Sequence, residues 1–168
     1  MTGGLPLRPF LPADTGRLQD LFAQSVEELT QDEYDEEQRL AWVSRAADGE
    51  AFAARLARGV TLLVEANGEI LGFASLAAGK EIDMLYVHPF AVGRGVGTTL
   101  VDALERIAAA RGATAMTVDA SDTAHDFFER RGYAAVKRNT FQIGDVWVTN
   151  TTMLKPLKAT MAAAGGRA

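Results

Sequence analysis

The sequence contains no cysteine, only two histidines and no long apolar run. Without cysteine the chain cannot form disulfides, use a thiolate nucleophile or hold a metal through sulfur. The two histidines, His88 and His125, are too few to favour a histidine-built site, so we expect no metal. No segment approaches the ~18 apolar residues of a membrane-spanning helix, and the first residues lack the pattern of a secretory signal. These features predict a cytoplasmic protein.

The charge balance narrows the class of partner. The formal net charge is −5 at pH 7, which disfavours a surface for nucleic acid. Hydrophobic residues make up 48% of the chain and charged residues 23%, as is usual for a globular protein. The 168 residues predict one domain over 1–157, followed by a disordered tail, 158–168, that has no core pattern. We expect a small molecule or peptide as partner, with no nucleic acid and no membrane.

Hydrophobic spacing and turn residues predict one mixed sheet covered by helices. Helices are predicted over 11–29, 35–47, 96–112 and 121–132. The predicted N-caps are Asp14 or Thr15 for the first helix and Ser121 or Asp122 for the last. Strands are predicted over 5–10, 60–66, 69–78, 81–88, 113–120, 133–144 and 146–157, with a type I′ turn at Asn67-Gly68.

Three glycines in five positions, Gly93, Gly95 and Gly97, stand between the strand ending near Val87 and the helix beginning near Val96. Successive free N–H groups at a helix start, with the helix dipole behind them, form an anion site suited to a pyrophosphate. The alternative without a ligand is a tight turn that happens to be rich in glycine.

A dinucleotide-binding fingerprint needs Gly-x-Gly-x-x-Gly directly after a strand, with an acidic residue further on. Asp119 stands at the end of the next predicted strand and would be the ribose ligand. However, Thr98 occupies the third glycine position, and five residues separate Val87 from Gly93. A nucleotide-dependent oxidoreductase is therefore the weaker interpretation.

The stretch LYVHPFAVGRGVGTTL, residues 85–100, resembles the acyl-CoA-binding motif of the GNAT superfamily of N-acetyltransferases. That motif is a strand, then Gln/Arg-x-x-Gly-x-Gly/Ala, then a helix, and its signature falls on residues 92–97. DFFERRGY, residues 126–133, is similar to the Phe/Tyr-Glu-Lys-x-Gly-Phe segment that follows in the family. LRPFLPAD and VWVTNTTMLKPL resemble its first and last strands, so the resemblance spans about 5–157.

The resemblance implies an α/β fold of the α+β kind, a mixed, mostly antiparallel sheet of about seven strands flanked by about four helices. In the family the central pair of strands, here 81–88 and 114–119, splays apart to open a slot. It implies acetyl-CoA as co-substrate, with the pyrophosphate on the N–H groups of 93–98 and the pantetheine arm along the strand near Tyr86. The implied cofactor-binding residues are Leu85, Tyr86, Val87, Gly93, Arg94, Gly95, Val96, Gly97, Thr98, Ser121 and Phe128.

The sequence departs from the family pattern at two positions. Val92 stands where the motif usually has Gln or Arg, which removes one polar contact to the phosphates. Phe128 stands where many members have a tyrosine that protonates the departing thiolate. That step would then use water, Tyr133, His125 or no acid at all, with a slower reaction as the consequence.

Two carboxylates on the strand 81–88, Glu81 and Asp83, are the candidate general bases for the attacking amine. Glu81 lies six residues before Val87, the register at which histone-type members carry a glutamate base. Asp83 follows two residues later, on the same face by strand alternation. The alternative is that both are exposed charges near a strand end.

Other residues have a structural and a functional interpretation. Tyr34 and Trp42 could line an acceptor pocket or belong to the core. The segment 27–37 holds seven acidic residues in eleven and could attract a cationic amine or form a solvated face. The sequence thus predicts direct transfer of an acetyl group from acetyl-CoA to a primary amine of an unidentified small-molecule or peptide acceptor. The alternative is an acyl-CoA-binding regulatory module without catalysis, and a homodimer, common in the family, is one expected assembly.

Overall fold

The structure, a computed structural model, describes residues 4–158. The predicted tail lies outside this range except for Lys158. The strands are β1 (Leu7–Pro9), β2 (Val60–Ala66), β3 (Glu69–Ala77), β4 (Glu81–Val87), β5 (Ala115–Ser121), β6 (Ala134–Ile143) and β7 (Val146–Pro156). The helices are α1 (Thr15–Leu29), α2 (Glu36–Ser44), α3 (Gly49–Ala57), α4 (Val96–Ala110) and α5 (His125–Arg130). Within the described range, no helix is long and apolar enough to cross a membrane.

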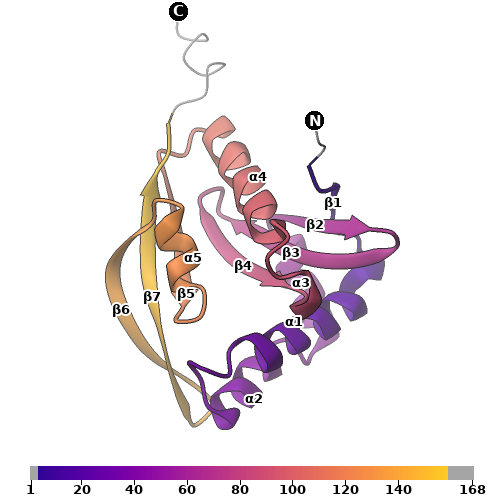
Figure 1. Cartoon of the computed structure of the whole chain (residues 1–168), viewed down its shortest axis with the longest axis vertical. Coiled ribbons are helices and arrows are strands. Elements are labelled where there is room, and N and C mark those ends of the chain that lie inside the picture. Colours follow the sequence, from indigo (N-terminus) through magenta and orange to yellow (C-terminus); the bar gives the residue numbers. More distant parts are fainter. Residues whose placement is uncertain (1–3, 159–168) are drawn as a thin grey trace, which may run out of the picture.

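The strands form one sheet in the order β1-β2-β3-β4-β5-β7-β6 (Figure 1). Neighbouring strands are antiparallel except β4 and β5, which run parallel. These two strands pair only at Glu81 with Thr117 and at Ile82 with Val118, and then diverge. The sheet therefore divides into an N-terminal half, β1 to β4, and a C-terminal half, β5 to β7. This confirms the predicted mixed, mostly antiparallel sheet with a splayed central pair.

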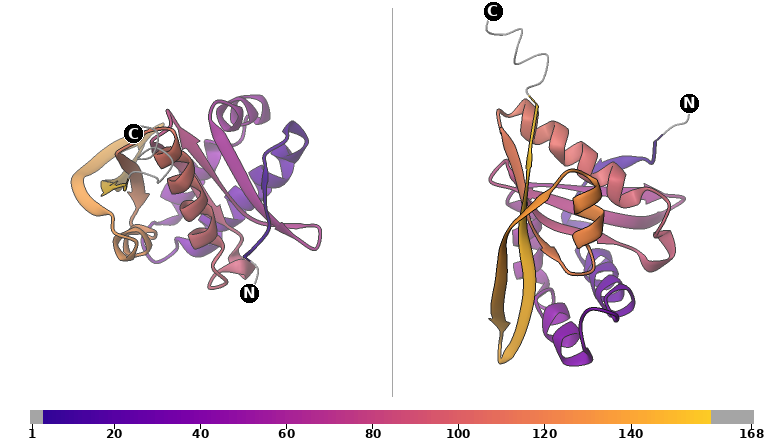
Figure 2. Two further views of the ribbon diagram at one scale, coloured as in Figure 1. Left: turned by 90° about the horizontal axis from the view of Figure 1, so that it is seen from above. Right: turned by 60° about the vertical axis from the view of Figure 1, so that its left-hand side comes forward.

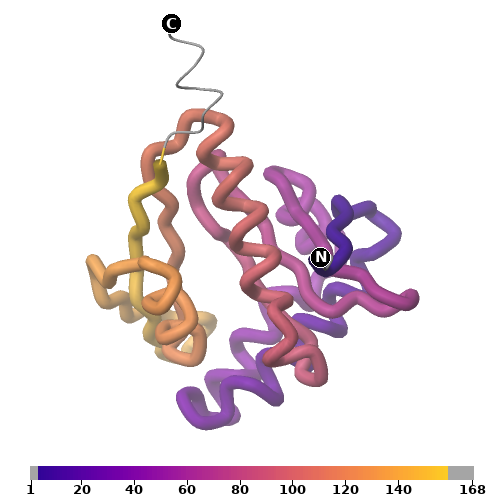
Figure 3. Tube along the Cα trace, turned by 45° about the horizontal axis from the view of Figure 1, so that its top comes forward, coloured from indigo at the N-terminus to yellow at the C-terminus, as the bar shows by residue number. Residues whose placement is uncertain are grey.

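Helices pack on both faces of the sheet. α4 covers one face, where Val96, Leu100 and Leu104 join a core shared by both halves. α1 and α3 cover the other face of the N-terminal half, through side chains such as Leu18 and Phe52. Figure 3 shows α4 (salmon) running between the magenta strands of the N-terminal half and the orange and yellow strands of the C-terminal half.

The long hairpin of β6 and β7 extends beyond the rest of the sheet, as the right-hand view of Figure 2 shows. Its far end meets α2, where Gln38 Nε2 donates a hydrogen bond to the carbonyl of Trp147 at 2.9 Å. This contact brings the N-terminal helices against the C-terminal half at a second place, remote from the β4–β5 pairing.

Strand β4 carries one extra residue, Asp83. Ser75 of β3 pairs with Met84 and Leu76 pairs with Ile82, so Asp83 is left between them as a β-bulge. Because of the bulge, Ile82 faces the core under α4, whereas Met84 faces the core under α1 and α3. Without the bulge the two side chains would share one face of the strand.

Several predicted boundaries are confirmed. Asn67 and Gly68 have φ values of 54° and 80°, as the type I′ turn requires. Asp35 caps α2, and its side chain accepts a hydrogen bond from the Gln38 N–H. α4 begins at Val96 as predicted.

The helix predicted over 35–47 was wrong in extent, because it ends at Ser44, and a further helix, α3, was not predicted. Asp48 caps α3 by accepting from the Ala51 N–H, and Phe52 and Leu56 place its apolar face in the core. With only nine residues, α3 shows little more than one repeat of the helical pattern. The structure therefore has five helices in its described part, where about four were expected.

The predicted N-cap of the last helix was also wrong, whereas the predicted N-cap of the first helix, Asp14, stands at that position but does not cap through its side chain. Ser121 is the last residue of β5, paired with Asn150, and α5 begins only at His125. Its hydroxyl still accepts from the Ala124 N–H at 3.1 Å. At the start of α1, Asp14 makes no side-chain cap, because its carboxylate is taken up by Arg8 at 2.8 Å.

Candidate active site

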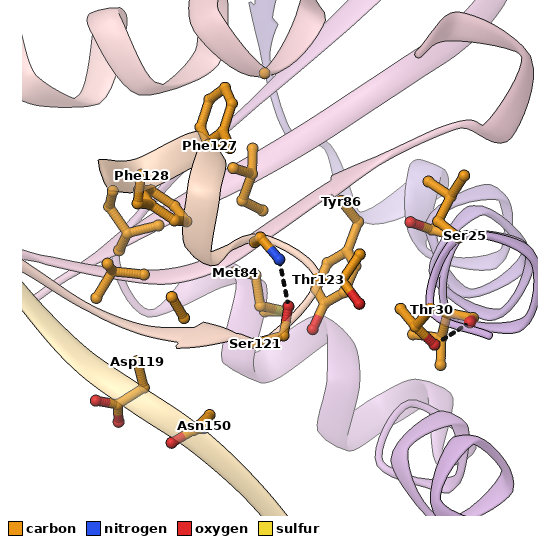
Figure 4. Close-up of a pocket in the computed structure, with 18 of the residues that line it drawn as sticks. Ser25, Thr30, Met84, Tyr86, Asp119, Ser121, Thr123, Phe127, Phe128 and Asn150 are labelled. Atoms are coloured by element: carbon orange, nitrogen blue, oxygen red, sulfur yellow. Dashed lines mark hydrogen bonds between the residues drawn. The ribbon is translucent and has the colours of Figure 1, made fainter. Parts of the chain in front are cut away.

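A cavity of about 1290 Å³ occupies the splay between the two halves of the sheet. Figure 4 shows its walls, with Ser25 on α1, Thr30 directly after α1, Tyr86 on β4, and Asp119 opposite on β5. The predicted site residues that line it are Glu81, Asp83, Leu85, Tyr86, Val87, Gly93, Gly95, Val96, Gly97, Thr98, Ser121 and Phe128. Of the predicted site residues, only Arg94 does not line it.

The glycine loop before α4 forms one end of the cavity. Gly93 and Gly95 both have a φ of 83°, in the left-handed region that glycine adopts without strain. A Cβ at either position would meet no heavy atom within 4 Å, so side-chain packing does not demand glycine there. The positive φ of the backbone favours glycine at both positions instead. The loop also leaves its backbone open toward the cavity.

The free N–H groups of this loop lie at the first turn of α4. The N–H of Thr99 is bonded to the carbonyl of Gly95 at 2.9 Å, while the first N–H groups of a helix have no partner within the helix. Those of Val96, Gly97 and Thr98 are therefore available for an anion. The N–H of Arg94 is not available, because it donates to the Ala91 carbonyl at 3.3 Å. The expectation that N–H groups from 93 to 98 hold the pyrophosphate stays a prediction.

The edge of β4 that faces β5 is open along the cavity. Pairing with β5 stops after Ile82, so residues 85–87 have no neighbour on that side among the described strands. On the other side, Leu85, Tyr86 and Val87 pair with β3. This leaves backbone N–H and C=O groups that could bind the amides of an extended ligand.

The two candidate bases have different surroundings. Asp83 forms a two-point ion pair with Arg55, with Nε–Oδ2 and Nη2–Oδ1 distances of 2.8 and 3.0 Å. Glu81 makes no ion pair or side-chain hydrogen bond with any residue in the described range. Burial raises the pKa of Glu81, the carboxylates of Asp83 and Asp119 raise it further, and Arg55 lowers it. Of the two, Glu81 is the carboxylate that can receive a proton without losing an ion pair.

The alternatives for the missing tyrosine acid are narrowed by the structure. Phe128 is 1% exposed and packs edge-on against Phe127 and Tyr133, with ring centroids 5.1 and 5.2 Å away. The hydroxyl of Tyr133 donates to Glu105 at 2.7 Å, and burial raises the pKa of this phenol. Neither Tyr133 nor His125 is among the residues that line the cavity.

Aromatic side chains line the part of the cavity between α2 and β4. Trp42 donates its Nε1–H to the hydroxyl of Tyr86 at 3.1 Å, and Tyr34 packs edge-on against Trp42 at 5.2 Å. Burial raises the pKa of Tyr34 to about 12, so its hydroxyl is protonated at neutral pH. The sequence left open whether Tyr34 and Trp42 line an acceptor pocket or belong to the core. Tyr34 is buried and lines the cavity, and Trp42 lines the cavity as well.

Tyr34 also ties the two halves of the molecule together. Its hydroxyl donates to the carbonyl of Thr149 on β7 and accepts from the N–H of Asp122, each at 2.8 Å. Next to it, the hydroxyl of Thr123 donates to Glu33 at 2.6 Å. The segment between α1 and α2 is thereby fastened across the open end of the splay. We call these contacts the Tyr34 bridge.

Sequence reasoning missed much of the cavity wall. The added lining residues include Arg45, Arg55, Phe127, Arg130 and residues of the β6–β7 hairpin such as Phe141 and Asn150. For Arg130 a signal was present, because it lies within DFFERRGY. For Arg45 and Phe141 there was none, because they lie on helix and strand segments that only the tertiary fold brings together.

Comparison with known proteins places this architecture in a family. The family described as "Acetyltransferase (GNAT) domain" matches residues 30–154. The uncharacterized N-acetyltransferase YafP of Escherichia coli (strain K12) is 31% identical over 149 residues, which cover 89% of this chain and 94% of that protein.

Solved structures of N-acetyltransferases share this fold. The crystal structure of a GCN5-related N-acetyltransferase from Rhodopseudomonas palustris, also named "Aminotransferase, Class-II", is 53% identical, covers 94% of this chain and 98% of its own, and superposes with a TM-score of 0.91. An N-acetyltransferase from Thermoplasma acidophilum, solved in complex with coenzyme A, shares the fold at 19% identity and a TM-score of 0.75, covering 92% of this chain and 99% of its own. With a matching family domain over most of its length and these relatives, the chain belongs to the GNAT superfamily and is an N-acetyltransferase.

Proposed function

We propose that the cavity binds acetyl-CoA and an acceptor amine together, and that the acetyl group passes directly between them. The observation that carries the proposal is the meeting of three features in one cavity. These are the free N–H groups at the start of α4, the open edge of β4 at 85–87, and the unpaired Glu81. The donor fits the residues present, since the loop offers an anion site and the strand edge offers hydrogen bonds to amides.

The geometry supports the following division of work. The N–H groups of Val96, Gly97 and Thr98 bind the pyrophosphate, assisted by the dipole of α4. The edge at 85–87 aligns the pantetheine arm and leads the thioester into the splay. Backbone N–H groups at this edge also stabilise the oxyanion that forms on the carbonyl oxygen, an effect worth about 10²–10³ in rate in other enzymes.

The proton balance assigns a role to Glu81. The acceptor reaches the cavity as an ammonium ion and must lose a proton before its nitrogen attacks the thioester carbon. Glu81 takes that proton, directly or through water, and passes it to solvent, and the C–N bond forms as the nitrogen attacks. The nitrogen then gives up its second proton to water or to Glu81, and the C–S bond breaks to release the thiolate of CoA. Because no tyrosine acid stands at Phe128, water protonates the thiolate, at some cost in rate.

An acyl-CoA-binding module without catalysis is the second candidate. It is supported by Phe128, whose ring offers no proton, and by the exposed Val92 beside the phosphate loop. Both candidates predict acetyl-CoA binding, and only the first predicts turnover.

The test measures the melting midpoint with ligands and then CoA release with amines. A ligand at about 100 times its Kd stabilises the folded state by about 2.7 kcal/mol, and each kcal/mol raises the midpoint by roughly 2–4 °C in a domain of this size. Acetyl-CoA should raise it by about 5–10 °C, CoA almost as much, and NAD or NADP not at all. A shift with the nicotinamide nucleotides alone would contradict the proposal and restore Asp119 as a ribose ligand. A shift with acetyl-CoA but no CoA release with any amine would favour the binding module.

A further inference from the structure

The proposed donor would contact only part of the wall of the cavity. The loop before α4 and the edge at 85–87 account for one part. The remaining part lies between α2, α3 and the β6–β7 hairpin and is lined by Trp42, Arg45 and Phe141. Under the proposed function this is where the acceptor binds, so its chemistry describes the acceptor.

The cationic side chains of this region fall into two kinds. Arg55 and Arg138 are paired, with Asp83 at 2.8 Å and with Asp122 at 2.6 Å. The side chain of Arg45 makes no hydrogen bond or ion pair with any residue in 4–158, although Arg45 lines the cavity. Arg45 is exposed at the edge of the cavity, so its charge is accessible to a ligand there.

Phe141 holds Arg45 in place without using its donors. The guanidinium carbon of Arg45 lies over the Phe141 ring, 5.4 Å from its centroid. A cation on the face of a ring keeps its N–H groups free, because they lie in the guanidinium plane. The charge of Arg45 is also close enough to Tyr86 to lower the pKa of that phenol, although burial raises it overall. Arg45 and Tyr86 of β4 therefore lie at the same part of the cavity.

A second uncommitted cation lies on the strand that carries Phe141. Lys137 precedes it by four positions on β6, hence on the same face, and also lines the cavity. Within the described range its ammonium group has no ion-pair partner either. The cavity thus has unpaired positive charge on the side of α2 and β6, and the unpaired carboxylate of Glu81 on β4.

From this arrangement we propose that the acceptor is an amine that also carries a carboxylate, and that Arg45 binds that carboxylate. The amine is directed to Glu81 and the carboxylate to the fork of Arg45, whose N–H groups match a carboxylate at two points. Trp42 and Phe141 contact the apolar part between them. The inference rests on the proposed function for the location of the donor, and it narrows the acceptor to amino acids and similar compounds.

The experiment separates binding from turnover. Calorimetry on the full chain saturated with CoA would measure the affinity of N-acetylglycine, N-acetylleucine and N-acetylphenylalanine, each against its carboxamide. Turnover would be followed as CoA release with the corresponding free amino acids and their amides. The variants are Arg45→Gln and, as a matched control, Arg58→Gln, which removes the same charge at an exposed residue outside the cavity.

We expect at least one carboxylate to bind and react about tenfold or more better than its amide, and this preference to vanish in Arg45→Gln but not in Arg58→Gln. Equal affinity for acid and amide in every pair would overturn the inference, even if amines are acetylated. The same holds for a preference that survives in Arg45→Gln. Selective carboxylate binding that depends on Arg45, without any acetyl transfer, would uphold the carboxylate site and contradict the proposed function instead.

Discussion

Two carboxylates on one short strand have been given different properties by their neighbours. Asp83 is held by Arg55 in a two-point ion pair, whereas Glu81 is partly buried without a counter-ion. A carboxylate in the second situation has a raised pKa and accepts a proton more readily. The division between a structural and a reactive group is therefore set by α3, which supplies Arg55.

Replacing Glu81 with Gln tests this division. A base must be ionised to act, so wild-type turnover should rise with pH through the raised pKa of Glu81. Glu81→Gln should lower kcat about 10²-fold or more and remove that rise, as measured by a pH–rate profile.

Glu81→Gln, which should lower kcat, should not lower the stability of the folded state. Because folding raises the pKa of Glu81, ionisation of this carboxyl costs folded-state stability at any pH above the pKa that it has in the unfolded chain. Glu81→Gln should therefore melt no lower than wild type at pH 7, whereas Asp83→Asn, which strands Arg55, should melt lower. An unaltered rate profile in Glu81→Gln would transfer the role of base to Asp83 or to water.

Phe128 offers a test at a second residue. Its ring lines the cavity yet is buried against Phe127 and Tyr133. Phe128→Tyr adds one hydroxyl, which would supply the missing acid if the para position reaches the thioester. We expect kcat to rise threefold or more with a melting midpoint close to wild type. A fall in the midpoint without a gain in rate would show that the hydroxyl has been placed in the core.

At the scale of elements, the loop between β4 and α4 depends on backbone conformation. Gly95→Ala places a side chain at a φ of 83°, which costs roughly 1–2 kcal/mol, and it crowds the N–H groups proposed for phosphate. We expect acetyl-CoA affinity to fall at least tenfold by calorimetry. Gly68→Ala, at a φ of 80° in the distant β2–β3 turn, carries the same strain and should leave the affinity unchanged. An equal loss in both variants would attribute the effect to stability alone.

The Tyr34 bridge joins the helical segment between α1 and α2 to the C-terminal half. Tyr34→Phe removes the hydroxyl that bonds both Thr149 and Asp122 and takes this partner from two half-buried backbone groups, at a cost of about 0.5–1.5 kcal/mol for each bond. We expect KM for the acceptor to rise several-fold while KM for acetyl-CoA changes little, because the bridge borders the acceptor side. Equal changes in both KM values would mean that the bridge sets the width of the whole slot.

The elements that the sequence predicted well are those with local signals. Asn67-Gly68, the cap at Asp35 and the start of α4 are specified by residues within a few positions of one another. Ser121 shows the limit, because a good cap residue was kept in β5 by pairing with Asn150, far along the chain. The acceptor wall could not be predicted for the same reason. Arg45 meets Phe141 only when β6 folds back beside α2.

At the scale of the whole molecule, the two halves of the sheet share few strand hydrogen bonds. They are joined by the short β4–β5 pairing, by the core under α4 and by the Tyr34 bridge. A donor bound in the splay would add contacts to both sides. We expect acetyl-CoA to slow amide hydrogen exchange at 85–87 and 96–98 and also at 121–125, with little change in β1 and β2. Protection confined to the β4–α4 side would show that the donor does not bridge the halves.

The bulge at Asp83 means that β4 has one residue more than its pairing with β3 needs. Loss of the single codon for Asp83 would restore regular alternation to the strand and leave Ile82 and Met84 on the faces that they occupy now. Tyr86 would keep its place in the cavity, whereas Arg55 would lose its ion-pair partner. Such a shortened chain should therefore still fold. In the evolution of this strand, loss of one residue should be tolerated at the bulge, where no later side chain has to change faces.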